Sequence, residues 1–197
     1  MKKDEKRKAP YAIRSALCAL RSAALCLAVS AHGQTGQIDS LCAAALRHLQ
    51  AGDADSAISL LRVVTHHHPR DAAAHVRLGR AYLAAKDSAR GEEALKKAIS
   101  LGKGKELTEA YYGLGLIHMK RPKGLYTAID YFREALIGDR DYVEARYQMA
   151  KARYLLWEHD AKADVEKVLK AHPNHAEACL LMGDWYANFK EDYAQAI

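Results

Sequence analysis

Small residues recur along this chain at nearly constant intervals. Gly or Ala stands at positions 45, 79, 115, 150 and 183, which gives spacings of 34, 36, 35 and 33 residues. Each lies in a short pattern of an apolar residue, a small residue and often an aromatic residue three positions on, as in Leu78-Gly79-Arg80-Ala81-Tyr82. A period of 20 to 50 residues indicates a repeat architecture, whose units bury their apolar faces only by stacking on one another.

A second pattern follows each small residue after 11 to 13 positions. It consists of a small residue, a bulky apolar residue four positions later and a small or β-branched residue three further on. The copies are Ala57/Leu61/Val64, Gly91/Leu95/Ala98, Ala128/Phe132/Ala135 and Ala161/Val165/Val168. Because spacings of four and three place side chains on one face of a helix, each unit is predicted to be two amphipathic helices joined by a short turn.

The residues between these patterns are typical of turns and helix starts. Turn residues are expected at 51–53, 86–88, 121–124 and 158–160, which are rich in Gly, Asp and Pro. Asp71, Asp141 and Asn174 are predicted N-caps. Glu144 and Glu177 stand three residues after the last two, as in a capping box.

The small residues are predicted to let the two helices of a unit approach closely. Gly79 is expected to face Gly91, Gly115 to face Ala128, and Ala150 to face Ala161. A bulky side chain at any of these positions would hold the helices apart.

These features resemble the tetratricopeptide repeat (TPR) family, whose pattern of L-G, Y and later A, F, A and P is matched best by residues 72–105. The resemblance implies an all-α, right-handed α-solenoid of stacked antiparallel helix pairs over residues 36–197. Its units are expected at about 38–71, 72–107, 108–142, 143–175 and, in part, 176–197. The last copy stops at Ala194-Gln195-Ala196-Ile197, as its second helix begins, so we expect the sequence to be a fragment of a longer protein.

The positive charge of the chain is concentrated at its N-terminus. The net charge is +6, and residues 1–33 carry seven Lys/Arg and two acids, or +5, which leaves +1 for residues 34–197. A basic segment followed by the short apolar run 22–31 and small residues predicts an export signal over 1–33, cleaved after Ala31 or Gly33. The run is too short to span a bilayer. The alternative is a basic tail on a cytoplasmic protein. The near-neutral body argues against nucleic-acid binding.

No catalytic or cofactor motif is found, which predicts a chain that is not an enzyme and needs no cofactor. The run Thr65-His66-His67-His68-Pro69 suggests a metal site, but adjacent helical residues point about 100° apart. His68 aligns with His172, each directly before a proline that closes a unit, so the run is interpreted as a helix end. Cys42 and Cys179 are predicted to be buried apolar side chains, too far apart for a disulfide.

The resemblance implies that a concave groove, lined by the first helix of each unit, binds a protein partner. It places Val76 in the groove and nominates as partner-binding residues Arg77, Arg80, Tyr112, Leu116, Lys120, Tyr147, Lys151, Tyr154 and Asp184. The family's two-carboxylate clamp needs Lys and Asn at set positions, and no Asn occurs at position nine of any unit, so that ligand is not predicted. The tyrosines have an alternative role in packing between units.

The predicted function is therefore a non-catalytic scaffold that binds a peptide or partner helix in the concave groove. The alternative is that the repeats are the accessory region of a larger exported enzyme or of a secretion or envelope-assembly component.

Overall fold

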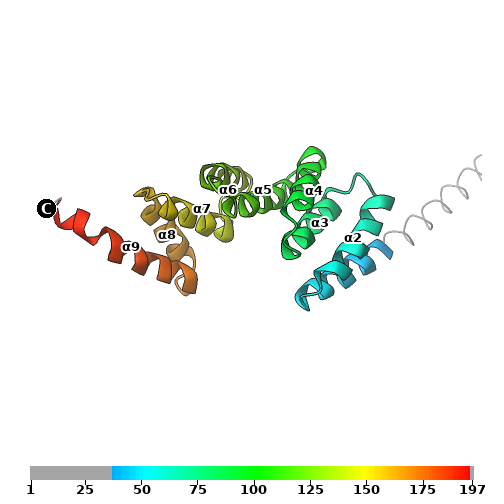
Figure 1. The fold of residues 1–197 in the computed structure, drawn as a ribbon, viewed down its shortest axis with the longest axis horizontal. Helices are drawn as coiled ribbons and strands as arrows, with labels where there is room; N and C mark the ends of the chain where they lie inside the picture. The colour runs from blue at the N-terminus through cyan, green and yellow to red at the C-terminus, as the bar shows by residue number, and fades with distance from the viewer. Residues whose placement is uncertain (1–36, 196–197) are drawn as a thin grey trace, which may run out of the picture.

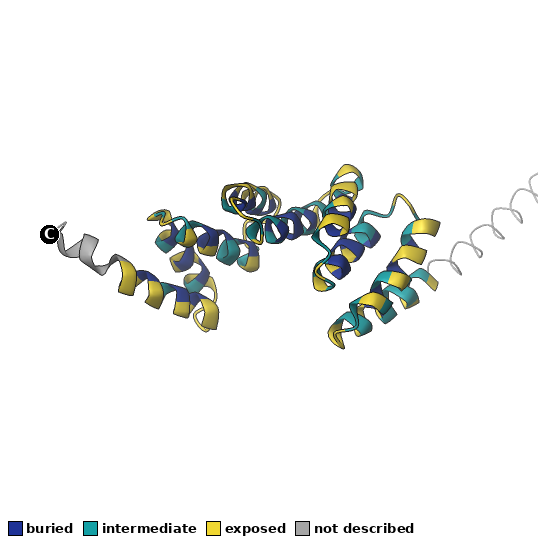
Figure 2. Ribbon diagram, viewed as in Figure 1, coloured by how far each residue is buried: buried dark blue, intermediate teal, exposed yellow. Residues whose placement is uncertain are grey.

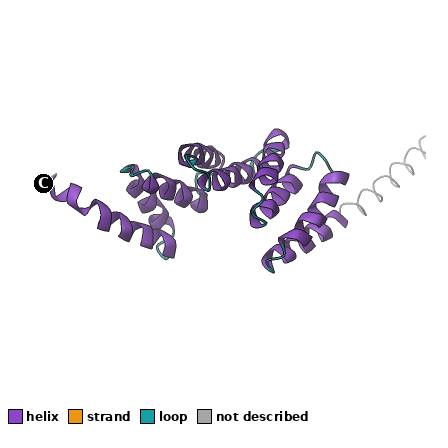
Figure 3. Ribbon diagram, viewed as in Figure 1, coloured by secondary structure: helices purple, strands orange, loops and turns teal. Residues whose placement is uncertain are grey.

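The computed structural model describes residues 37–195, with side chains described as far as residue 188. A helix over residues 37–50 is followed by α2 (Ala54–His67), α3 (Ala72–Ala84), α4 (Ser88–Leu101), α5 (Lys105–Met119), α6 (Leu125–Gly138), α7 (Val143–Leu155), α8 (Asp160–Ala171) and α9 (Ala176–Gln195). The described residues contain no strand (Figure 3). Residues 1–33, where the export signal is predicted, lie outside the described range.

The helices stack as pairs into an elongated solenoid (Figure 1). The pairs are residues 37–50 with α2, α3 with α4, α5 with α6, and α7 with α8, while α9 follows alone. First helices contact one another from unit to unit, α3 with α5, α5 with α7 and α7 with α9. Among the described helices, no second helix contacts another second helix. The first helices therefore form the inner layer of the stack, and the predicted all-α solenoid of helix pairs is confirmed.

The small residues lie where the helices of a unit cross. A Cβ added to Gly79 would come within 3.3 Å of the Gly91 carbonyl oxygen and 2.6 Å of Leu95 Cγ. A Cβ added to Gly115 would overlap the ring of Phe132, four residues after Ala128. Leu95 and Phe132 are fully buried, so each fills the space that its glycine leaves. The predicted close approach at Gly79 is confirmed.

The turn inside each unit repeats one backbone conformation. Gly52, Lys86, Lys123 and Trp157 have φ angles of +81°, +62°, +62° and +60° and occur at corresponding places after the first helix. Only glycine adopts this left-handed region without steric cost. The second helices α2 and α4 then begin with Asp53 and Asp87, whose carboxylates accept the N–H groups of Ser56 and Arg90. These two caps were not predicted.

The N-cap of α3 is the predicted Asp71, whose carboxylate accepts the Ala74 N–H at 3.2 Å. The predictions of Asp141 and Asn174 are wrong, because α7 and α9 start one residue later than expected. Tyr142 is the N-cap of α7, and the Asp141 N–H donates to Asp139 at 3.0 Å within the preceding turn. At α9 the Nδ1 atom of His175 accepts the Ala178 N–H at 3.2 Å.

The histidine run ends a helix, as predicted. Helix α2 ends at His67, and the His68 N–H donates to the Val64 carbonyl at 2.8 Å. Helix α8 ends one residue before His172, whose N–H donates to Val168 at 2.8 Å. Within residues 37–188, no three His, Cys, Asp or Glu side chains are grouped closely enough to hold a metal ion.

Burial is continuous through the complete pairs and falls on α9 (Figure 2). Cys42 is half-buried, and neither Cys42 nor Cys179 forms a disulfide. The prediction that Cys179 is buried is wrong, because the side of α9 on which it lies has no second helix against it. None of the described helices has the length and apolar character needed to cross a membrane.

Candidate binding surface

The inner layer of first helices contains a cleft at its N-terminal end. The cleft has a volume of about 690 Å³ and lies between the helix over residues 37–50, α3 and α5. Its walls carry two cations, two anions, a thiol and an exposed apolar side chain, which are Arg77, Arg80, Asp39, Glu109, Cys42 and Leu46. We call these six residues the N-terminal cleft. Three successive units contribute to it, so it exists only in the stacked fold.

The charges in the N-terminal cleft are weakly paired. An Nη1 atom of Arg80 lies 4.0 Å from Glu109 Oε2, and the Arg80 side chain is 64% exposed. Exposed ion pairs at this distance contribute little to stability. Both groups are therefore available to a ligand at small cost. Leu46, with 54% of its surface exposed, supplies an apolar contact beside them.

Cys42 lies beside the second arginine of the cleft. The Cys42 Sγ atom is 3.8 Å from Arg77 Nη1. Burial raises the pKa of the Cys42 thiol, although the Arg77 guanidinium acts in the opposite direction. The thiol therefore stays protonated at neutral pH and acts as a small, weakly polar wall of the cleft.

The three nominated tyrosines bind neighbouring units together. The Tyr112 ring lies 5.0 Å from the ring of Tyr142, the N-cap of α7. The Tyr147 ring lies 4.9 Å from His175, which caps α9. The Tyr154 hydroxyl accepts a hydrogen bond of 2.6 Å from Asn188 Nδ2. Each ring thus contacts the next unit, which is the packing role that was the alternative to ligand contact.

Burial between the units also acts on the ionisation of these phenols. It raises the pKa of Tyr112, Tyr147 and Tyr142 above the ordinary value for tyrosine, most strongly for Tyr142. The hydroxyls therefore remain neutral at physiological pH and can donate hydrogen bonds.

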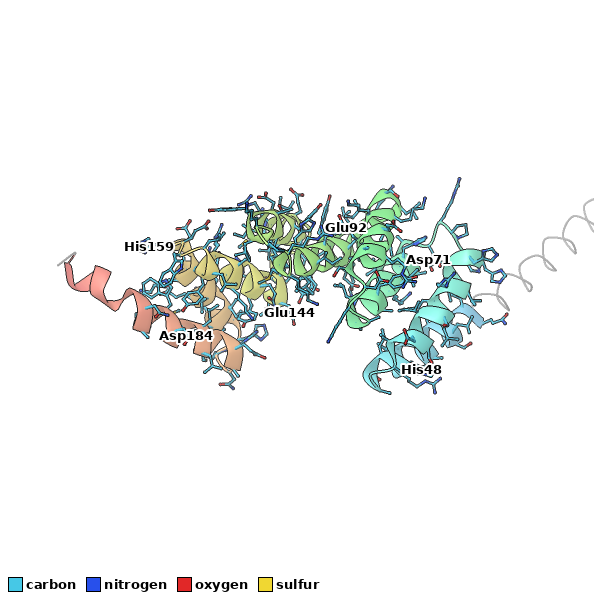
Figure 4. All side chains as sticks on the ribbon, in the orientation of Figure 1. His48, Asp71, Glu92, Glu144, His159 and Asp184 are labelled. Carbon is cyan, nitrogen blue, oxygen red and sulfur yellow. The ribbon has the colours of Figure 1, made fainter. Side chains whose placement is uncertain are left out.

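The other nominated residues are spread along the solenoid. Leu116 is half-buried and packs with Phe132, and Lys120 is the C-cap of α5 rather than part of its inner face. Lys151 and Asp184 are exposed, the latter on α9 (Figure 4). Of the nine nominated residues, only Arg77 and Arg80 line the N-terminal cleft.

Two differences from the sequence-based groove stand out. Val76 was also placed in the groove, and this is wrong, because it is only 2% exposed and packs with Leu95 and Leu114. Asp39, Cys42 and Glu109 line the cleft but were not nominated. The only sequence signal for them was the acidic character of position two in several units, which includes Asp39 and Glu109.

The most buried charges have a structural role. Arg153 donates to Asp164, which is only 3% exposed, and so ties α7 to α8. Arg121 donates to Glu92 and ties the turn after α5 to α4. The Arg121 and Lys96 side chains beside Glu92 lower the pKa of its carboxyl. Each of these carboxylates is held by cations within the fold and is thereby unavailable as a general base.

Comparison with known proteins places this architecture. Residues 48–114 match the family model of the tetratricopeptide repeat. Similar solved structures include MamA, with 26% identity over 72% of this chain and 82% of that chain and a TM-score of 0.63. They also include PilF of Pseudomonas aeruginosa, with 21% identity, 81% and 72% coverage and a TM-score of 0.72.

A further similar structure is the first TPR of Spaghetti (RPAP3) bound to an HSP90 peptide. It shares 20% identity with this chain, covers 61% of this chain and 96% of its own, and has a TM-score of 0.56. No curated protein sequence matches the chain significantly. The family match covers the units that form the N-terminal cleft, and the structural matches confirm the TPR-like fold.

Proposed function

We propose that the protein is a non-catalytic interaction scaffold whose inner layer of first helices binds a segment of a partner protein. The observation that carries the proposal is the N-terminal cleft, in which Arg77 and Arg80 stand beside exposed Leu46 on a preformed surface. A preformed site reduces the ordering cost of binding. The peptide-bound TPR of Spaghetti supports the proposal by showing that a similar fold holds a peptide.

The chemistry of the cleft restricts the partner segment. Arg77 and Arg80 favour a carboxylate, because a guanidinium binds carboxylates through two parallel hydrogen bonds. Asp39 and Glu109 stand on the same walls and disfavour a run of acidic residues. Leu46 favours one apolar side chain. We therefore expect a segment that combines an isolated acidic residue with an apolar anchor, and further contacts along Lys151 and Asp184.

A charge-reversal pair tests this surface. The variant Arg80→Glu/Lys151→Glu changes one exposed cation in the cleft and one further along the inner layer. We expect the affinity of a purified partner, first identified by pull-down, to fall by about tenfold or more, which corresponds to about 1.4 kcal/mol. Lys97→Glu/Lys170→Glu, on the exposed sides of second helices α4 and α8, has the same net charge and is the matched control.

The outcome separates the inner layer from the rest of the surface. If the Arg80/Lys151 variant retains every partner at unchanged affinity, the assignment of the inner layer is wrong. If both double variants lose binding equally, the partner responds to net charge rather than to the cleft.

We also propose that the chain is exported and loses residues 1–33. The proposal is supported by the basic and apolar composition of that segment and by the near-neutral charge of the remainder. N-terminal sequencing of the protein from each cellular fraction tests it. A start near residue 32 or 34 outside the cytoplasm is expected, and an intact Met1 in the cytoplasm contradicts it.

A further inference from the structure

Helix α9 exposes side chains that its counterpart α3 buries. Aligned on the small residues Gly79 and Gly183, Val76 corresponds to Leu180 and Tyr82 to Tyr186. Val76 is 2% exposed but Leu180 is 70% exposed, and Tyr82 is 6% exposed but Tyr186 is 51% exposed. The residue types are alike, so the difference arises from the neighbours of each helix and not from its own sequence.

The missing neighbour is the second helix of the unit. In the complete units a bulky side chain from the second helix seats on the glycine of the first, Leu95 on Gly79 and Phe132 on Gly115. At Gly183 a Cβ would meet nothing within 4 Å. Helix α9 contacts α8 and α7 of the preceding unit, which cover its other side. The seat for a bulky residue is thus present on α9 and open.

The open side forms a continuous apolar stripe. Leu180, Gly183 and Tyr186 are three residues apart, which places them along one face of a helix. Cys179 and Ala187 are exposed beside them. We call Leu180, Gly183 and Tyr186 the open face of α9. On the other side Leu181 and Trp185 are buried against the preceding units, which holds the open face in a fixed orientation.

We propose that the open face of α9 binds, in trans, an amphipathic helix with the second-helix pattern of small residue, bulky apolar residue four positions on and small residue three further. The three complete units described in full show this contact as α3–α4, α5–α6 and α7–α8, each built from that pattern. The open face repeats the first-helix half of the same contact, so the complementary half fits it.

The pattern also specifies the geometry of the complex. The bulky residue of the bound helix seats on Gly183, as Phe132 seats on Gly115. Its first small residue lies against Tyr186, as Gly91 lies 3.4 Å from the Cβ of Tyr82 when a Cβ is placed on that glycine. A helix without the small residue would be kept away from α9 by the tyrosine. This site is separate from the N-terminal cleft, which lies at the opposite end of the solenoid (Figure 1).

A peptide from the chain itself provides the probe. We would label a peptide of residues 121–139, which contains α6, and titrate it with the full chain while following fluorescence anisotropy. Saturable binding is expected, and a peptide with Phe132→Asp is expected to bind about tenfold more weakly or worse, because its charge would be buried at the seat. In the protein, Gly183→Leu fills the seat and is expected to weaken binding by a similar factor.

The variants are chosen so that a failure is informative. Gly183→Leu has open space for its side chain and improves helix propensity, so the fold and the thermal midpoint are expected to be retained. The Arg80→Glu/Lys151→Glu variant should bind the peptide normally, because it changes only the inner layer. No binding of the α6 peptide, or binding that Gly183→Leu leaves unchanged, overturns the proposal.

Self-association is the competing outcome. Sedimentation of the chain alone shows whether two copies cover each other through the open face. Dimers that Gly183→Leu dissociates, and that excess α6 peptide does not dissociate, would mean that a second copy rather than a second-type helix occupies the face. That result would also overturn the proposal.

Discussion

Helices α5 and α9 carry a glycine at the same place in their units, yet the two glycines have different surroundings. A Cβ at Gly115 would overlap the Phe132 ring, whereas a Cβ at Gly183 would meet no atom within 4 Å. The comparison shows that the sequence of a first helix specifies an apolar face, while the second helix decides whether that face is core or surface. Stability in such a stack is therefore a sum over neighbouring helices.

The largest expected effect comes from removing the side chain that covers α5. Phe132 is fully buried, and Phe132→Ala should lower the free energy of unfolding by about 3–5 kcal/mol, through lost burial and the cavity left behind. Chemical denaturation followed by circular dichroism measures it. Tyr126→Ala, on the exposed side of the same helix, should change the free energy by less than about 0.5 kcal/mol. A similar small loss for both variants would show that α6 does not cover α5.

A smaller loss is expected from adding one methyl group beneath the same ring. In Gly115→Ala the new Cβ would lie 2.6 Å from Phe132 Cδ1, so the ring or the helix must shift. Overpacking of this kind costs about 1–3 kcal/mol, and the same denaturation experiment measures it. A double variant with Phe132→Leu should recover part of the loss, since the smaller side chain makes room. Equal losses with and without Phe132→Leu would contradict the proposed contact.

The matched substitution on α9 should have the opposite sign. Gly183→Ala adds a methyl group in open space inside a helix, and Gly is less favourable than Ala there by about 0.5–1 kcal/mol. The free energy of unfolding should therefore rise by up to that amount, measured beside Gly115→Ala under the same conditions. A loss at Gly183 comparable to that at Gly115 would mean that another helix covers α9 in solution.

The repeat register was predictable because it depends on side chains within one unit. The spacing of Gly79, Gly91 and Leu95 specified two helices and their crossing point, and the structure shows that contact. The same local reasoning placed His68 and His172 at helix ends. Residues that contact only their own helix pair carry enough information in their periodicity to be assigned.

Errors arose where a neighbouring unit or a turn decides the outcome. Cys179 was expected to be buried, but no second helix covers its side of α9. Val76 was assigned to the groove, but α4 and α5 bury it. Asp141 lost the capping position because Asp139 closes the preceding turn and moves the start of α7 by one residue.

The candidate site was only partly accessible to sequence reasoning for the same cause. Arg77 and Arg80 could be nominated from their positions in one unit, and both line the N-terminal cleft. Asp39 and Glu109 belong to the preceding and following units, so their approach to the arginines depends on the stacking of three units. A pattern within single units does not encode that distance.

The smallest expected effect concerns the charge of a covered residue. His118 on α5 corresponds in register to Tyr186 on α9, and its ring lies 5.2 Å from that of Tyr131 on α6. Burial lowers the pKa of His118 below its ordinary value of 6.5, and the Arg121 and Lys96 charges act in the same direction against the opposing effect of Glu92.

The sign of the pH dependence follows from that shift. Because the folded pKa lies below the unfolded one, the stabilisation is fully present above about pH 6.5 and is lost as the pH falls through the folded pKa, since the unfolded chain then binds more protons. His118→Gln should remove this contribution, so thermal midpoints measured from pH 8 to pH 5 should fall less steeply for the variant than for the wild type. Parallel profiles for the two proteins would show that α6 and Arg121 do not restrict protonation of His118, and a steeper profile for the variant would reverse the assigned sign. Cover by a second helix thus has an electrostatic consequence on α5 that the open face of α9 does not share.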